Sequence, residues 1–205
     1  GAPVIVVSGL PRSGTSMAMK MLEAGGLELV VDHARTADED NPKGYYEDER
    51  VKALAEADDA SWLRHARGKA IKIVSSLLNH LPPGNFYKTV FMRRDLHEVL
   101  ASQAKMLERR GESSHTDDAE LLRMYEAHLE KAVFQLRFRP NFEALYVNYS
   151  DVIGDPVAEA RRIADFVGGL EAEAMAGVVD GSLYRNRRGE GDAAAVEARS
   201  GAGTG

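Results

Sequence analysis

The chain has 205 residues, of which 44% are hydrophobic and 28% are charged, and its formal net charge is -6. This length predicts a single compact domain with a sizeable core, and the acidic balance argues against a nonspecific nucleic-acid binder. Cysteine is absent, which excludes disulfides, zinc–thiolate sites and thiol catalysis and favours a reducing compartment. No apolar run reaches the roughly 18 residues that cross a bilayer, and no signal peptide precedes the first strand pattern. We therefore expect a cytoplasmic protein without a transmembrane segment.

The first expected element is a strand over residues 3–7, because "PVIVV" is a short and continuously apolar run. A glycine-containing turn follows, and then a helix that carries Ala18, Met21 and Leu22 on one face. The glycines of "EAGG" (23–26) end this helix. The chain thus opens as strand, loop and helix.

Strand and helix patterns alternate along the rest of the chain. A polar loop at 33–51 leads into a helix from about Asp48. The patterns predict strands at 68–76, 86–94 and 142–149, and helices at 95–111, 116–136, 155–169 and 172–181. This alternation predicts a single α/β domain with a mostly parallel central sheet flanked by helices on both faces. We expect the domain to span 1–192 and the Gly/Ala-rich residues 193–205 to form a disordered tail.

The turn after the first strand reads G-L-P-R-S-G-T-S from Gly9 to Ser16. Such a turn presents backbone N–H groups and the positive end of a helix dipole to an anion. The nucleotide-triphosphatase pattern needs Lys where Thr15 stands, whereas Arg12 supplies a cation earlier in the loop. A sulfuryl donor carries less charge on its transferring group than ATP does, so it can do without that Lys and without Mg²⁺. An ordinary turn without a ligand stays open at this point.

Two stretches taken together, "PRSGTS" (11–16) and "VFMRRDLHEVLASQ" (90–103), resemble the sulfotransferases that use adenosine 3′-phosphate 5′-phosphosulfate (PAPS). The resemblance implies that Arg94, at a strand end, and Ser102, in the next helix, bind the 3′-phosphate. Weaker similarity at 41–48, 144–168 and 182–192 extends it over about residues 4 to 192. The loop residues that it implies for the 5′-phosphosulfate are Arg12, Ser13, Gly14, Thr15 and Ser16.

The resemblance also implies that Tyr149 contacts the adenine and that Arg187, Arg188 and Gly189 close over the 3′-phosphate. A simpler interpretation stays open for each of these residues. Tyr149 can be a packing residue, and a basic pair near a chain end is commonly just solvated. Arg94 can pair with Asp95 or Glu98, and helical spacing puts Ser102 on a polar stripe, off the buried face.

Sulfuryl transfer to a hydroxyl requires a group that accepts the proton of the acceptor. Many PAPS-dependent sulfotransferases carry a His in the stretch that corresponds to 71–76. The stretch "IKIVSS" of this chain has none. Glu47 is the candidate base, beside two aromatic residues that can raise its pKa, and His33 is the second choice. Arg12 is the candidate for stabilising charge on the transferring group and on the leaving phosphate. The histidines with no constellation around them in the sequence are His65, His80, His97, His115 and His128.

The sequence therefore predicts a PAPS-dependent sulfotransferase that acts on a hydroxyl or amine of a small molecule or glycan. The transfer is expected to be in-line and metal-independent, and no nucleic acid is expected as a partner. Two alternatives stay open: a non-catalytic nucleotide-binding module of the same fold, and a P-loop kinase of a small molecule. Mg²⁺-dependent ATP binding would favour the kinase, and binding of adenosine 3′,5′-bisphosphate without turnover would favour the module.

Overall fold

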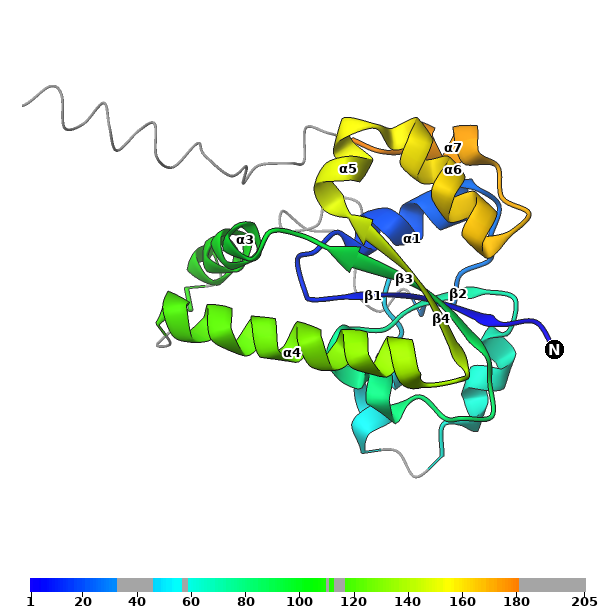
Figure 1. Cartoon of the computed structure of the whole chain (residues 1–205), viewed down its shortest axis with the longest axis horizontal. Helices are drawn as coiled ribbons and strands as arrows, with labels where there is room; N and C mark the ends of the chain where they lie inside the picture. The colour runs from blue at the N-terminus through cyan, green and yellow to red at the C-terminus, as the bar shows by residue number, and fades with distance from the viewer. Residues whose placement is uncertain (33–45, 57–58, 110, 113–116, 181–205) are drawn as a thin grey trace, which may run out of the picture.

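The computed structural model describes residues 1–32, 46–56, 59–109, 111–112 and 117–180. Within these residues lies a four-stranded sheet in the order β2-β1-β3-β4, and every strand pair in it is parallel. The strands are β1 (Val4–Gly9), β2 (Ala70–Lys72), β3 (Tyr87–Arg93) and β4 (Phe142–Asn148). The predicted α/β architecture with a parallel central sheet is confirmed (Figure 1).

Helices cover both faces of the sheet, as Figure 1 shows. Successive side chains of a strand point to opposite faces, so β1 contributes Ile5 and Val7 to one core and Val4 and Val6 to the other. The first core packs against α1 (Thr15–Ala24), α6 (Pro156–Val167) and α7 (Ala172–Gly177). The second packs against α4 (Asp118–Phe138) and the 3₁₀ helices η2 (Ser61–Ala66) and η3 (Ser75–His80).

All four strands end at the same edge of the sheet because they are parallel. From this carboxyl edge leave the turn into α1, the start of η3, α3 (Leu96–Arg109) and α5 (Tyr149–Gly154). In sheets of this kind, ligands bind in the crevice outside the carboxyl ends of the strands. Within the described part of the chain, the residues predicted for the cofactor lie on these connections or at the strand ends.

Two elements differ from the sequence-based expectation. The strand predicted at 68–76 is shorter in the structure: β2 ends at Lys72 and the chain turns into η3 from Ser75. Ile73 N–H still donates to the Val7 carbonyl (2.9 Å) just beyond the strand end. An apolar run reads the same in a buried strand and in a buried 3₁₀ helix. Tyr149 was expected to end a strand and instead begins α5.

The short helix predicted near Asp48 is α2 (Glu49–Lys52), which continues into η1 (Ala53–Ala55). Several other predictions lie outside the described residues: His33, His115, the basic loop at 182–192 and the tail at 193–205. No helix in the described part of the chain combines the length and the apolar character needed to cross a membrane.

Candidate phosphate site at the carboxyl edge of the sheet

Residues 9–16 join β1 to α1 and are called the phosphate loop after the ligand predicted for them. This loop is tightly folded on itself. The buried Ser13 hydroxyl donates to the Leu10 carbonyl at 2.6 Å. Gly9 has a φ of 148°, and a Cβ there would lie 2.5 Å from Ser13 Oγ and 2.6 Å from the Met92 carbonyl oxygen. Gly14, with a φ of 98°, is the N-cap of α1, and no side chain caps this helix. A helix N-terminus that lacks a capping side chain and follows such a loop is suited to hold an anion.

The loop contacts both residues that were predicted for the 3′-phosphate. Arg12 Nε donates to Ser102 Oγ at 2.9 Å, and Arg94 Nη1 donates to the Arg12 carbonyl at 3.1 Å. These contacts join segments that are separated by 90 and 82 residues in the chain. The structure thus brings Arg12, Ser13, Gly14, Arg94 and Ser102 together at one edge of the sheet.

Arg94 is buried and held from several sides. Its Nε lies 3.1 Å from a Glu98 carboxylate oxygen, with 8% and 5% of the two side chains exposed, and its guanidinium lies 4.5 Å from the Tyr149 ring centre. The pairing with Glu98 that the sequence left open is therefore present. Asp95 instead caps α3, because Asp95 Oδ1 accepts from the N–H groups of His97 (3.0 Å) and Glu98 (3.3 Å). Arg94 is well positioned, but Glu98 offsets part of its charge.

The expected exposure of Ser102 is wrong. Helical spacing correctly groups Ser102 with Glu98, yet these residues are only 6% and 5% exposed. This end of the stripe faces the phosphate loop rather than solvent, so Ser102 Oγ accepts from Arg12 Nε. Farther along the stripe, Lys105 and Arg109 are exposed. A polar helical stripe indicates a common face, and it does not say whether that face meets water or another polar segment.

Tyr149 packs between the loop and Arg94. A Cβ at Gly14 would lie 2.5 Å from Tyr149 Cδ2, so the ring occupies the space that any other residue at position 14 would need. Burial is the main cause that raises the pKa of the Tyr149 hydroxyl, against the opposing effect of Arg94. Tyr149 is a packing residue of the site, and its contact with adenine stays a prediction.

Lys72 is a site residue that the sequence analysis missed. It ends β2, only 6% of its side chain is exposed, and its Nζ lies 3.4 Å from Ser16 Oγ and 3.2 Å from a Glu47 carboxylate oxygen. A second cation therefore lies beside the phosphate loop. The signal was a single Lys inside the apolar run "AIKIV", because a buried charge of this kind needs a partner.

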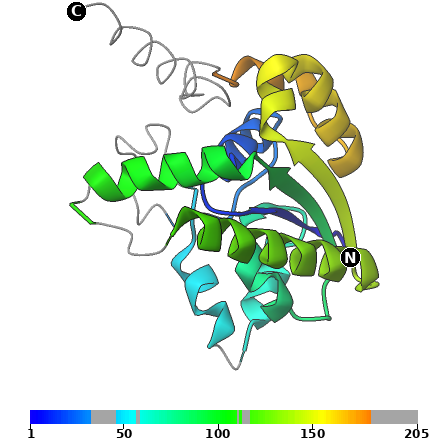
Figure 2. The ribbon, with the colours of Figure 1, turned by 60° about the vertical axis from the view of Figure 1, so that its left-hand side comes forward.

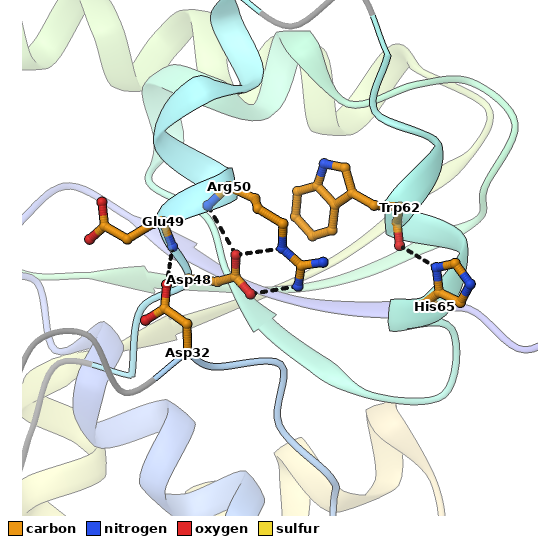
Figure 3. Close-up of polar contacts among 6 residues, drawn as sticks. All are labelled: Asp32, Asp48, Glu49, Arg50, Trp62 and His65. Carbon is orange, nitrogen blue, oxygen red and sulfur yellow. Dashed lines mark hydrogen bonds and ion pairs between the residues drawn. The ribbon is translucent and has the colours of Figure 1, made fainter.

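Glu47 reaches this edge because the short segment around it is anchored on both sides. Asp32 N–H donates to the Glu47 carbonyl at 3.1 Å, and the Asp32 carboxylate accepts from Glu49 N–H at 2.5 Å. On the other side, Arg50 binds the Asp48 carboxylate through Nε and Nη2 at 2.9 and 2.7 Å (Figure 3). The Glu47 side chain, 24% exposed, is thereby held against Lys72.

The Asp48–Arg50 pair is itself fixed by an aromatic ring. The Arg50 guanidinium lies 4.3 Å from the centre of a Trp62 ring, on the 3₁₀ helix η2 (Figure 3). Only 3% of the Asp48 side chain is exposed, so its charge depends on Arg50 for compensation. The segment that carries Glu47 is therefore tied to the α4 side of the sheet.

His128 has a partner that the sequence did not indicate. Its Nε2 lies 2.7 Å from Ser75 Oγ, and Ser75 is only 3% exposed at the start of η3. Burial lowers the pKa of His128, with a smaller contribution from Lys131. A helix 53 residues away in the chain thus brings an imidazole to the stretch 71–76, which has no His of its own. Among the described residues, no group of three or more His, Asp or Glu is placed to hold a metal ion.

The family model described as "Sulfotransferase family" matches residues 76–173. This segment contains Arg94, Ser102 and Tyr149, and the resemblance to sulfotransferases inferred from the sequence is confirmed there. Among curated proteins, none matches the chain.

Several solved structures resemble the chain. They include retinol dehydratase in a complex with retinol and PAP, with a TM-score of 0.49 and 21% identity over 85% of this chain. The sulfotransferase domain from the curacin biosynthetic pathway has a TM-score of 0.46 and 13% identity over 82% of this chain and 74% of its own. A sugar kinase from Janibacter sp. HTCC2649 has a TM-score of 0.43 and 14% identity over 82% of this chain and 95% of its own. The chain spans 61–63% of the retinol dehydratase chains.

Proposed function

We propose that this chain is a sulfotransferase that moves the sulfuryl group of PAPS to a hydroxyl or amine of a small molecule or glycan. One observation carries the proposal: the loop predicted for the 5′-phosphosulfate is hydrogen-bonded to both residues predicted for the 3′-phosphate. Arg12 donates to Ser102, and Arg94 donates to the Arg12 carbonyl. A donor with phosphates at two positions needs two such sites at a fixed separation. The family match over residues 76–173 supports the same conclusion.

In this proposal the loop amides and the N-terminus of α1, from Ser13 to Ser16, hold the 5′-phosphosulfate. Arg94 and Ser102 hold the 3′-phosphate, and Arg187, Arg188 and Gly189 close over it from outside the described residues. Arg12 must exchange its Ser102 partner for an oxygen of the bound donor in order to act on the transferring group. PAPS, when bound, supplies the sulfuryl group and leaves as adenosine 3′,5′-bisphosphate.

The protein contributes charge and a proton acceptor to the transfer. As the acceptor oxygen bonds to sulfur and the bond from sulfur to the phosphate oxygen breaks, negative charge grows on the leaving phosphate. Arg12, in the loop, and Lys72, whose Nζ lies 3.4 Å from Ser16 Oγ, balance that charge. Glu47 takes the proton of the acceptor hydroxyl. Once Glu47 is neutral, the Lys72 ammonium is no longer compensated by that carboxylate and acts more strongly on the leaving phosphate.

Calorimetry with adenosine 3′,5′-bisphosphate, AMP and ATP, each with and without Mg²⁺, tests the donor. We expect the bisphosphate to bind far more tightly than AMP, without a requirement for Mg²⁺. Equal affinity for AMP and the bisphosphate would overturn the proposal, and Mg²⁺-dependent binding of ATP would identify a kinase instead. Tight bisphosphate binding with no transfer from labelled PAPS to any acceptor would identify a binding module.

A further inference from the structure

A cavity of about 430 Å³ opens beside the phosphate loop on the α4 side of the sheet. Its wall is formed by the loop, the end of β3, α3 and α4. Figure 2 shows α3 and α4 lying close to each other at this end of the molecule, and the two helices are in contact. The residues that line the cavity are Leu10, Ser13, Met92, Arg93, Arg94, Val99, Leu129, Glu130 and Val133.

The cavity is adjacent to the proposed donor site and distinct from most of it. It shares Ser13 and Arg94 with that site, so a molecule inside it would touch the phosphate loop. The aromatic contact of Arg94 is with Tyr149 of α5, whereas Arg93 stacks on Tyr146 at 4.2 Å, and Tyr146 packs against the core on the α4 side. The cavity therefore meets the donor residues at Ser13 and Arg94 and extends from them toward α4. Its volume falls within the roughly 300–1,000 Å³ that is usual for small-molecule sites.

Most of the lining is aliphatic. The side chains of Leu10, Val99, Leu129 and Val133 offer no hydrogen bonds, and the Met92 thioether is only a weak acceptor. A hydroxyl buried against such a wall loses its water partners without replacement, which weakens binding by roughly 5- to 150-fold for each hydroxyl. A sugar carries a hydroxyl on nearly every carbon, so this wall disfavours it strongly.

The charged residues of the lining do not select for a charged ligand. Arg93 and Glu130 are both exposed, come from β3 and α4, and carry opposite charges. Arg94 is paired with Glu98 and, in the proposed function, also binds the 3′-phosphate of the donor, so its charge is already used. The polar end of the cavity is thus the loop itself, at Ser13, which is where the hydroxyl of an acceptor would meet the sulfuryl group.

We propose that this cavity is the acceptor site and that the acceptor is an uncharged, largely apolar alcohol or phenol rather than a sugar. The inference rests on the proposed function and narrows its acceptor class. The apolar body lies against α3 and α4, and the single hydroxyl points to the phosphate loop.

The test uses 2-naphthol, whose intrinsic fluorescence reports binding, and glucose as a polyol, in the presence of adenosine 3′,5′-bisphosphate. We expect saturable binding of 2-naphthol and none of glucose, and the same preference in transfer from labelled PAPS. Val133→Trp fills the cavity and should weaken 2-naphthol binding at least tenfold while leaving bisphosphate affinity unchanged. The matched control is Phe134→Trp, since Phe134 is 63% exposed on the next position of the same helix and should have no effect.

Val133→Thr tests the cavity even if the Trp variant does not fold, because Thr keeps the volume of the side chain and adds one hydroxyl to the wall. We expect it to weaken 2-naphthol binding several-fold with bisphosphate affinity intact. Binding of glucose in preference to 2-naphthol, or 2-naphthol binding that is indifferent to both changes at Val133, would overturn the acceptor assignment while the donor assignment stands. Loss of all bisphosphate binding in the wild type would instead overturn the proposed function.

Discussion

The two sides of the phosphate loop are built differently. On the β3 side, Arg94, Glu98 and Ser102 belong to one strand–helix unit, and these three side chains are almost fully buried. On the β2 side, Lys72 and Glu47 come from separate segments, and Glu47 keeps 24% of its side chain exposed. The difference separates two tasks: a rigid unit suits the binding of the part of the donor that does not react, and an accessible carboxylate suits a group that takes up and releases a proton. Each experiment that follows sharpens or breaks this division.

The largest effect is expected from Glu47→Gln on the β2 side. If the carboxylate takes the acceptor proton, turnover should fall on the order of 10²–10⁴-fold with bisphosphate affinity retained. Glu49→Gln is the control, because Glu49 is exposed and pairs with Lys52. Wild-type turnover in Glu47→Gln would show that another group takes the proton of the acceptor.

Arg12→Ala should lower turnover more than it lowers affinity, because the charge that Arg12 meets grows during the transfer. By analogy with the loss of one donor to a developing anion, we expect about 10²–10³-fold in kcat. Steady-state kinetics with varied PAPS separates the two quantities. A rise in the KM for PAPS with an unchanged kcat would assign Arg12 to donor binding rather than to the chemical step.

Arg94→Ala on the β3 side should weaken bisphosphate binding by about 1.5–3 kcal/mol, the usual value of a hydrogen bond to a charged group. Arg94→Ala alone also removes the cation beside the buried Glu98 carboxylate, which would then repel the phosphate of the ligand. The change is therefore measured in a Glu98→Gln background, where that negative charge is absent. Calorimetry measures the change, and Arg93→Ala is the control on the neighbouring position. Equal affinity for AMP in wild type and variant would assign the loss to the 3′-phosphate.

The smallest effect concerns stability and tests the Ser75–His128 contact. Burial lowers the pKa of His128, so the unfolded chain binds this proton at a higher pH than the folded chain does. The free energy of unfolding from this group is therefore lost as the pH falls below the unfolded value of about 6.5, and it is fully present above that value. His128→Gln should flatten urea unfolding stability between pH 7.5 and pH 5.5 relative to the wild type. The exposed His97→Gln should leave the slope unchanged; if both variants behave alike, the contact does not hold the imidazole neutral.

The sequence predicted the arrangement of the candidate site best where its residues lie close together in the chain. The loop from Gly9 to Ser16 and the spacing of Arg94 and Ser102 are local patterns, and the alternation of strands and helices fixed their common edge. The sequence did not indicate the contacts of Lys72 and His128, because their partners lie on segments 25 and 53 residues away and only folding places them together. The exposure of Ser102 was misjudged for a related reason: periodicity defines a helical face without saying what covers it.

The backbone at Arg12 adopts a strained conformation. Its φ is 69°, the left-handed region that a non-glycine residue occupies at a cost of roughly 1–2 kcal/mol. Glycine would adopt this geometry without strain, yet the position carries a long cationic side chain. The chain thus accepts a locally unfavourable conformation in order to place a guanidinium at the mouth of the loop. Glycine and alanine at this position differ in strain while both remove the charge, so comparing them separates the shape of the loop from its electrostatics.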